Sequence, residues 1–130
     1  MPAEVPVNVS RERFERLVVE ALVSIPEPLR ARMENVAVVV EEWPTPDHLA
    51  GAGLDEEDLL FGLYEGTPLT ERGVVAEAVL PDKITIFQGP LEEACASEEE
   101  IRQEVRTTIV HEVAHHFGFD EERLAELGYD

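Results

Sequence analysis

The segment from Ser97 to Gly118 constrains the fold of this chain more than any other, because it has the pattern of one long helix with two defined ends. Apolar residues recur along it at helical spacing, at Ile101, Val105, Ile109 and Val113. Ser97 followed by three glutamates is typical of a helix start, with serine as the N-cap and Glu100 as its capping-box partner. Gly118 is typical of a helix end. The sequence therefore predicts a helix of roughly 20 residues.

The last turns of this helix contain the motif His-Glu-x-x-His. His111 and His115 are four residues apart, so they lie on the same helix face, where two imidazoles can bind one metal ion. Glu112 lies one residue further round, off the ligand face, within reach of a water molecule on that metal. This pattern on a helix is typical of zinc hydrolases. The sequence predicts zinc ligands at His111 and His115 and assigns the role of catalytic general base to Glu112.

A third metal ligand is expected just after Gly118, where glycine lets the backbone double back beneath the metal. Glu121 stands six residues after His115, the offset at which the extended motif H-E-x-x-H-x-x-G-x-x-H places its third ligand. A carboxylate occupies that position here, and two histidines with a carboxylate suit zinc, although such a set also binds iron. Glu121 is the predicted ligand. Asp120 is the alternative, and both acids also fit an ordinary helix start.

The distribution of histidines supports the prediction of a metal site. Three of the four histidines of the chain lie within six residues, which is unlike scattered surface residues. His116 points away from the face of His111 and His115, so a packing role or support behind the ligands is expected for it. The alternative function is a metal-binding regulatory or interaction module without catalysis. Glu112 argues against that alternative, because a purely structural metal site needs no general base.

Two further roles stay open in the sequence. A hydrolase needs a donor for the developing oxyanion, and Tyr64 and Tyr129, the only tyrosines, can each supply it or pack as ordinary aromatic residues. A strand over 83–87 is expected beside the metal helix, where its edge can pair with an extended peptide. An internal strand without a free edge is an equally good interpretation of the same residues.

Helix and strand patterns alternate along the rest of the chain. They predict a helix over 11–24 capped by Ser10, a short helical turn over 29–33, a buried strand over 36–40, an irregular acidic stretch over 45–60, a short strand from 61, a hairpin of 74–80 with 83–87, a short helix over 91–96 and a last helix over 121–127. This order predicts an α+β fold in a single domain over 1–130, with a small mixed sheet packed against helices.

Charge and composition exclude several classes of protein and site. With 29 acidic and 10 basic residues, the chain has a net charge of −19, which repels nucleic-acid phosphates and anionic membranes, so neither is expected as a partner. The single cysteine, Cys95, excludes an intrachain disulfide. No apolar stretch reaches the length of a transmembrane helix, and the first residues lack the pattern of a signal peptide. A cytoplasmic protein is therefore expected, with its oligomeric state open.

The chain resembles minimal zincin-like metallopeptidases, which are small bacterial domains with a His-Glu-x-x-His-x-x-Gly motif. The resemblance is carried by residues 111–118, 62–72 and 84–87. It implies a zincin-like fold in which an active-site helix and an N-terminal helix pack on a small mixed sheet, with zinc at His111 and His115. It also implies hydrolysis of a peptide or protein substrate by metal-activated water. Glu121 departs from the pattern, because longer relatives have histidine there.

Overall fold

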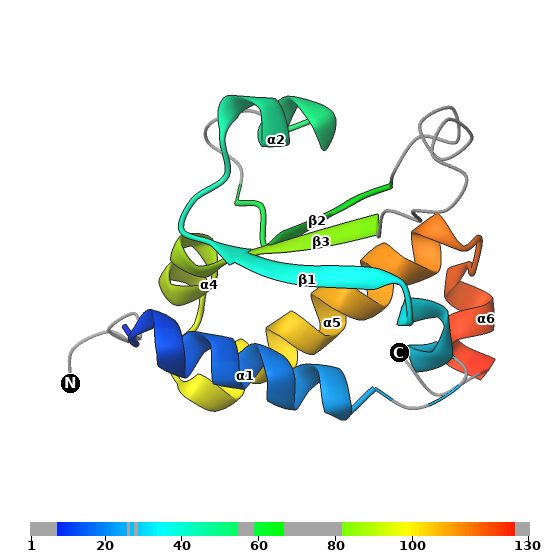
Figure 1. Cartoon of the computed structure of the whole chain (residues 1–130), viewed down its shortest axis with the longest axis horizontal. Helices are drawn as coiled ribbons and strands as arrows, with labels where there is room; N and C mark the ends of the chain where they lie inside the picture. Colours follow the sequence, from blue (N-terminus) through cyan, green and yellow to red (C-terminus); the bar gives the residue numbers. More distant parts are fainter. Residues whose placement is uncertain (1–7, 26, 28, 55–58, 67–81, 127–130) are drawn as a thin grey trace.

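The computed structural model describes residues 8–25, 27, 29–54, 59–66 and 82–126. Its elements are the helices α1 (Arg11–Val23), α2 (Pro46–Gly51), α4 (Gln88–Ala94), α5 (Glu98–His116) and α6 (Glu121–Glu126), the short 3-10 helix η1 (Arg30–Met33), and the strands β1 (Val36–Glu41), β2 (Gly62–Glu65) and β3 (Asp82–Phe87). The strands form one small mixed sheet, with α1 and α5 against one face and α2 on the other side (Figure 1). The predicted α+β class is confirmed.

Strand β3 lies in the centre of the sheet, in the order β1-β3-β2. β1 pairs with it in parallel, with Val36 opposite Asp82, and β2 pairs with it antiparallel, with Tyr64 opposite Ile84. The expectation that 83–87 offers a free edge is therefore wrong, and the internal-strand interpretation holds. β1 and β2 are the outer strands of the described sheet. This also explains why β1, expected to be buried, is half-buried over Val36–Val40.

The core lies between the sheet and the two long helices. Each helix turns one apolar face inward, and the inner face of β3 completes the core, with fully buried side chains at Phe14, Leu17, Ala21, Ile84, Ile86, Ile101, Val105, Ile109 and Val113. Two ion pairs at the rim, Arg13–Glu98 and Glu20–Arg102, join α1 to α5. The hydrogen bond from Arg13 lowers the pKa of the Glu98 carboxyl below its usual value. None of the described helices is long and apolar enough to cross a membrane.

Helix α5 begins and ends where its local sequence predicts. The Ser97 hydroxyl accepts from the backbone N–H of Glu100 at 3.1 Å, and the Glu100 carboxylate accepts from the N–H of Ala96. At the other end Gly118 has a φ of +81°, a left-handed conformation that favours glycine. The N–H of Phe119 then bonds to the carbonyl of Ala114 at 2.7 Å, which closes the helix and turns the chain toward α6.

Two short helices differ from their predictions. The stretch expected to be irregular contains α2, which begins after Thr45 in a capping box: the Thr45 hydroxyl accepts from the N–H of His48, and the His48 ring accepts from the N–H of Thr45. Threonine before Pro46 was the local signal, because proline is favoured in the first helical turn. Helix α4 begins at Gln88, three residues before the expected start. The expected strand over 74–80 lies outside the described residues.

Candidate metal and active site

The motif residues lie where the C-terminal half of α5 packs against β2 (Figure 1). The two elements approach closely at Gly62. A Cβ atom there would lie 2.6 Å from the side-chain methyl of Thr108, so a larger residue would force Thr108 or β2 to shift. This contact sets the height of β2 over α5. One turn further along the helix, it brings the backbone of Tyr64 beside Glu112.

The carboxylate of Glu112 is held by strand β2. The backbone N–H of Tyr64 donates to Oε1 of Glu112 at 2.8 Å, and the glutamate is half-buried. Its second oxygen, Oε2, has no hydrogen bond to any residue that the structure describes. One carboxylate oxygen is therefore held in place while the other remains able to accept a proton.

The ring of His111 is oriented by the helix itself. Its Nδ1 lies 2.9 Å from the carbonyl oxygen of Thr107, one turn earlier. A carbonyl only accepts, so in a neutral ring the proton is on Nδ1 and the lone pair is on Nε2. Metal-binding histidines commonly have this arrangement, in which a backbone carbonyl fixes the tautomer. His115 is exposed one turn further along the same helix face.

The predicted third ligand falls at the start of α6. Glu121 is the first residue of that helix, and its side chain lies outside the described part of the structure. The Asp120 carboxylate accepts from the N–H of Arg123 at 2.8 Å and so caps α6. Among the side chains that are described, no group of three or more His, Cys, Asp or Glu residues is close enough to hold a metal. The ligand set of His111, His115 and Glu121 therefore stays a prediction from the sequence.

Sequence reasoning missed a cluster formed by Tyr64, Asp82 and His116. The Tyr64 hydroxyl donates to Oδ2 of Asp82 at 2.6 Å, and the His116 ring stacks on the Tyr64 ring with centroids 4.1 Å apart. Asp82 is only 8% exposed. These contacts agree with the packing role expected for His116. The Tyr64 hydroxyl donates to a carboxylate, and this contact argues against Tyr64 as the oxyanion donor. Tyr129, the other candidate, lies outside the described residues.

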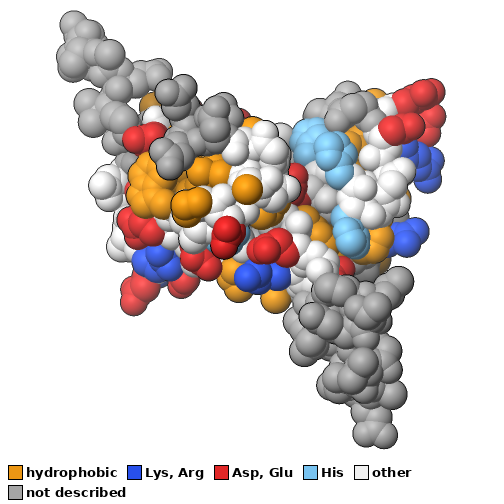
Figure 2. Space-filling view, turned by 90° about the horizontal axis from the view of Figure 1, so that it is seen from above, with side chains coloured by type: hydrophobic (Ala, Val, Ile, Leu, Met, Phe, Trp, Pro, Cys, Tyr) orange, Lys and Arg blue, Asp and Glu red, His pale blue; other side chains and the backbone are white. Residues whose placement is uncertain are grey.

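Two of the three histidines at the end of α5 are exposed to solvent. Figure 2 shows histidine side chains at one end of this face and a group of hydrophobic side chains at the other. His115 and His116 are exposed, whereas His111 is half-buried. An ion from solution can therefore reach the helix face that carries the motif.

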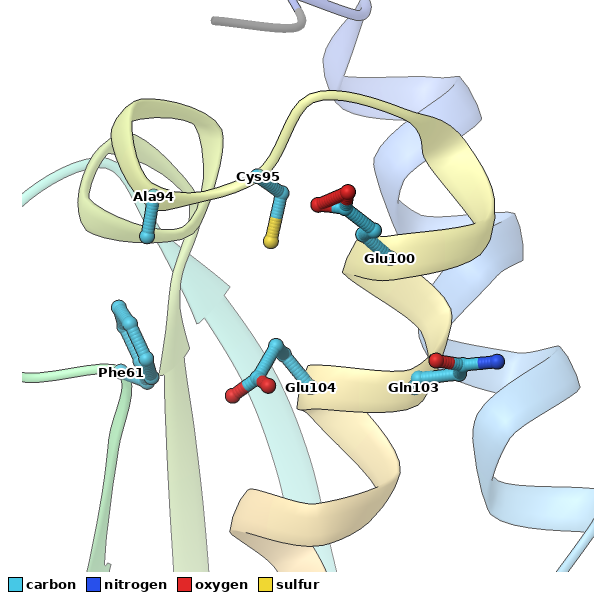
Figure 3. A pocket seen from close by; sticks show the side chains of 6 residues that line it. All are labelled: Phe61, Ala94, Cys95, Glu100, Gln103 and Glu104. Atoms are coloured by element: carbon cyan, nitrogen blue, oxygen red, sulfur yellow. The ribbon is translucent and has the colours of Figure 1, made fainter.

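A cavity of about 300 Å³ lies at the opposite end of α5, between α4 and the start of β2 (Figure 3). Its lining combines apolar and acidic side chains, from Phe61, Ala94, Cys95, Glu100, Gln103 and Glu104. None of the predicted metal ligands lines it. Burial of the Cys95 thiol raises its pKa to about 11, and the negative charges of Glu104 and Glu100 add to this rise.

We expect Cys95 to be nearly inert toward alkylating reagents. Because its pKa rises from 9.0 to about 11, the reactive thiolate fraction at pH 8 falls about 100-fold, before any steric protection. The measurement is the rate of modification by iodoacetamide in the folded protein and in concentrated urea. Equal rates in the two conditions would show that the thiol is neither buried nor electrostatically protected.

The comparisons with known proteins agree with this architecture. The chain matches the model of a family described as zincin-like metallopeptidases over residues 33–129, from the end of η1 through α6. A conserved hypothetical protein from Thermus thermophilus has a similar structure, with a TM-score of 0.55 and 24% sequence identity over 93% of this chain and 100% of that chain. That likeness shows the fold alone. A comparison with curated proteins finds no match. The family match covers most of the chain and includes the whole α5 motif, so this protein belongs to the zincin-like metallopeptidase family.

Proposed function

We propose that this protein is a zinc-dependent peptidase with Glu112 as its general base and His111, His115 and Glu121 as metal ligands. The observation that carries the proposal is the hydrogen bond from the Tyr64 N–H to Glu112, next to a histidine whose ring is oriented by a backbone carbonyl. A carboxylate held in place with one oxygen able to accept a proton suits the role of a general base. A structural metal site has no use for it.

The donor set suits the metal that the family implies. Zincin-like metallopeptidases bind a metal, typically zinc, and imidazole nitrogens with a carboxylate oxygen are zinc's usual ligands at catalytic sites. When bound, zinc lowers the pKa of a water molecule to about 7 and polarises the carbonyl of the bond to be broken. The Nδ1 hydrogen bond of His111 prepares this side chain for the role, because it keeps the lone pair on Nε2.

The chain's own contribution to the reaction is proton transfer. Oε2 of Glu112 takes a proton from the attacking water and later delivers it to the nitrogen of the leaving amine, so that the carboxylate is regenerated. The Tyr64 N–H holds Oε1 throughout, which limits rotation of the carboxylate. Each turnover breaks one amide bond and consumes one water molecule.

Strand β2 is the part of the sheet best placed to hold a substrate. It is an outer strand of the described sheet and lies beside the motif, unlike β3, which is paired on both sides. An extended peptide can add to such an edge through backbone hydrogen bonds other than the N–H of Tyr64, which donates to Glu112. The substrate class that we propose is an extended peptide or an unfolded protein segment. The net charge of −19 disfavours nucleic acid and anionic membranes as partners.

The test is hydrolysis of a broad peptide library by the zinc-loaded chain, with products identified by mass spectrometry. Removal of the metal by a chelator is expected to abolish cleavage, and stoichiometric zinc is expected to restore it. Cleavage that survives complete removal of metal would point to a contaminating or metal-independent activity. A protein that holds one zinc ion tightly and cleaves nothing would instead favour the metal-binding interaction module.

A further inference from the structure

We propose that Tyr64 and Asp82 are positioning residues, which act by holding the backbone N–H of Tyr64 against the carboxylate of Glu112. Asp82 fixes the Tyr64 hydroxyl and His116 fixes the face of its ring. The catalytic consequence of this arrangement rests on the proposed function, whereas the arrangement itself can be measured without any activity.

The chain of contacts begins at a well-anchored carboxylate. Asp82 is the first residue of the central strand, its backbone N–H donates to the carbonyl of Asn35 at 3.1 Å, and its side chain is buried. Its Oδ2 accepts from the Tyr64 hydroxyl at 2.6 Å and lies 3.5 Å from Nε2 of His116. A short hydrogen bond from a phenol to a carboxylate is stronger than a neutral one. The end of the Tyr64 side chain is therefore tied to the first residue of the central strand.

The ring of Tyr64 is fixed on its face as well as at its hydroxyl. The His116 ring lies over it with an interplanar angle of 20° and a centroid distance of 4.1 Å. His116 is itself braced by the edge of Phe117, with centroids 4.9 Å apart. His116, the last residue of α5, thus packs on the ring of Tyr64, and Glu112, one turn earlier, accepts from the Tyr64 backbone. Tyr64 therefore contacts α5 at two points, through its side chain and through its backbone.

These contacts add to the packing of Gly62 on Thr108 in holding β2 against α5. The strand is four residues long and, within the described sheet, pairs with β3 alone. The N–H of Tyr64 points away from β3 and reaches Glu112 over 2.8 Å. If the tyrosine side chain were released, the strand could move and this hydrogen bond would lengthen. A displacement of about 1 Å in a catalytic group can cost on the order of 100-fold in rate.

The test uses Tyr64→Phe, which removes one oxygen and keeps the ring stacking and the backbone N–H. The readout is the amide signal of residue 64 in a proton–nitrogen NMR spectrum of the full-length chain, with its hydrogen-exchange rate. The Glu112→Ala variant lacks the hydrogen-bond acceptor, so it gives the position of this amide signal when the hydrogen bond is absent. In Tyr64→Phe we expect the signal to move at least halfway to that position and exchange to quicken about tenfold.

A matched control deletes a different hydroxyl from the same sheet. Thr85→Val removes a fully buried hydroxyl on the opposite face of β3 that has no hydrogen-bond partner among the described residues. It is expected to leave the amide of residue 64 unchanged. Asp82→Asn, which keeps the size of the side chain and removes its charge, is expected to shift the amide in the same direction as Tyr64→Phe. If Tyr64→Phe fails to fold, the amide signal of residue 64 in Asp82→Asn tests the inference instead.

An amide of residue 64 that stays at its wild-type position in folded Tyr64→Phe and Asp82→Asn, as in Thr85→Val, would overturn the inference. Once a cleaved peptide is available as substrate, Tyr64→Phe is expected to lower kcat about tenfold and to change KM by less than about twofold. The shifted amide in a protein that cleaves no peptide would leave the positioning inference standing and overturn the proposed function. Normal hydrolysis with an unshifted amide would support the proposed function and overturn the positioning inference.

Discussion

Replacing His111 or His115 by alanine is expected to lower the affinity of the chain for zinc on the order of 100-fold or more, because a binding free energy of about 10–16 kcal/mol is shared among only a few ligands. Both residues lie on one face of α5, so either variant removes one of the two imidazoles on that face. The measurement is competition with a fluorescent zinc indicator. His48→Gln, in α2, is the matched control and should bind zinc as the wild type does. Full zinc occupancy in both alanine variants would show that the metal is bound elsewhere.

The same titration distinguishes the two acidic residues near the start of α6. Glu121→Ala is expected to weaken zinc binding clearly. Asp120→Asn is the matched control, because asparagine keeps the hydrogen bond to the N–H of Arg123 and hence the helix cap. It should change zinc affinity little. Unaltered affinity in Glu121→Ala would make that residue an ordinary acid of the first helical turn, and a larger loss in Asp120→Asn would move the ligand one position back.

Glu112→Gln is expected to retain zinc and to lower kcat by about 10²–10⁴-fold, the usual contribution of general acid–base catalysis. The glutamine carbonyl can still accept from the N–H of Tyr64, so the geometry of β2 and α5 should survive while the proton acceptor is lost. The rate is measured on a cleaved peptide from the library, with zinc content determined on the same sample.

Glu104→Gln provides the control for the loss of one negative charge from α5. Glu104 lies two turns before Glu112 and lines the separate cavity beside Cys95. Its replacement should leave kcat unchanged. A Glu112→Gln variant with wild-type kcat would contradict the mechanism, since it would show that a group other than Glu112 accepts the proton.

Much of α5 could be predicted from the sequence because its signals are local. The Ser97 cap and the left-handed Gly118 each act within a few residues, and the spacing of His111 and His115 follows from helix geometry alone. For the same reason α1, η1 and the existence of the three strands were predicted. The prediction of an irregular stretch at α2 is wrong although the signal there is also local, since the proline after Thr45 favours a helix start.

The order of the strands and the support of Glu112 depended on the tertiary structure. The apolar pattern of 83–87 predicts a strand but does not indicate which strands pair with it. In the structure β3 pairs on both sides and so lies in the centre of the sheet. Tyr64 and Glu112 are 48 residues apart, and Tyr64 and Asp82 are 18 apart, so no helical or strand periodicity links them. By itself the sequence determined which helix carries the two histidines and the glutamate. Packing of β2 on α5 at Gly62 decided which backbone group holds that glutamate, because the contact exists only once residues far apart in the chain share one core.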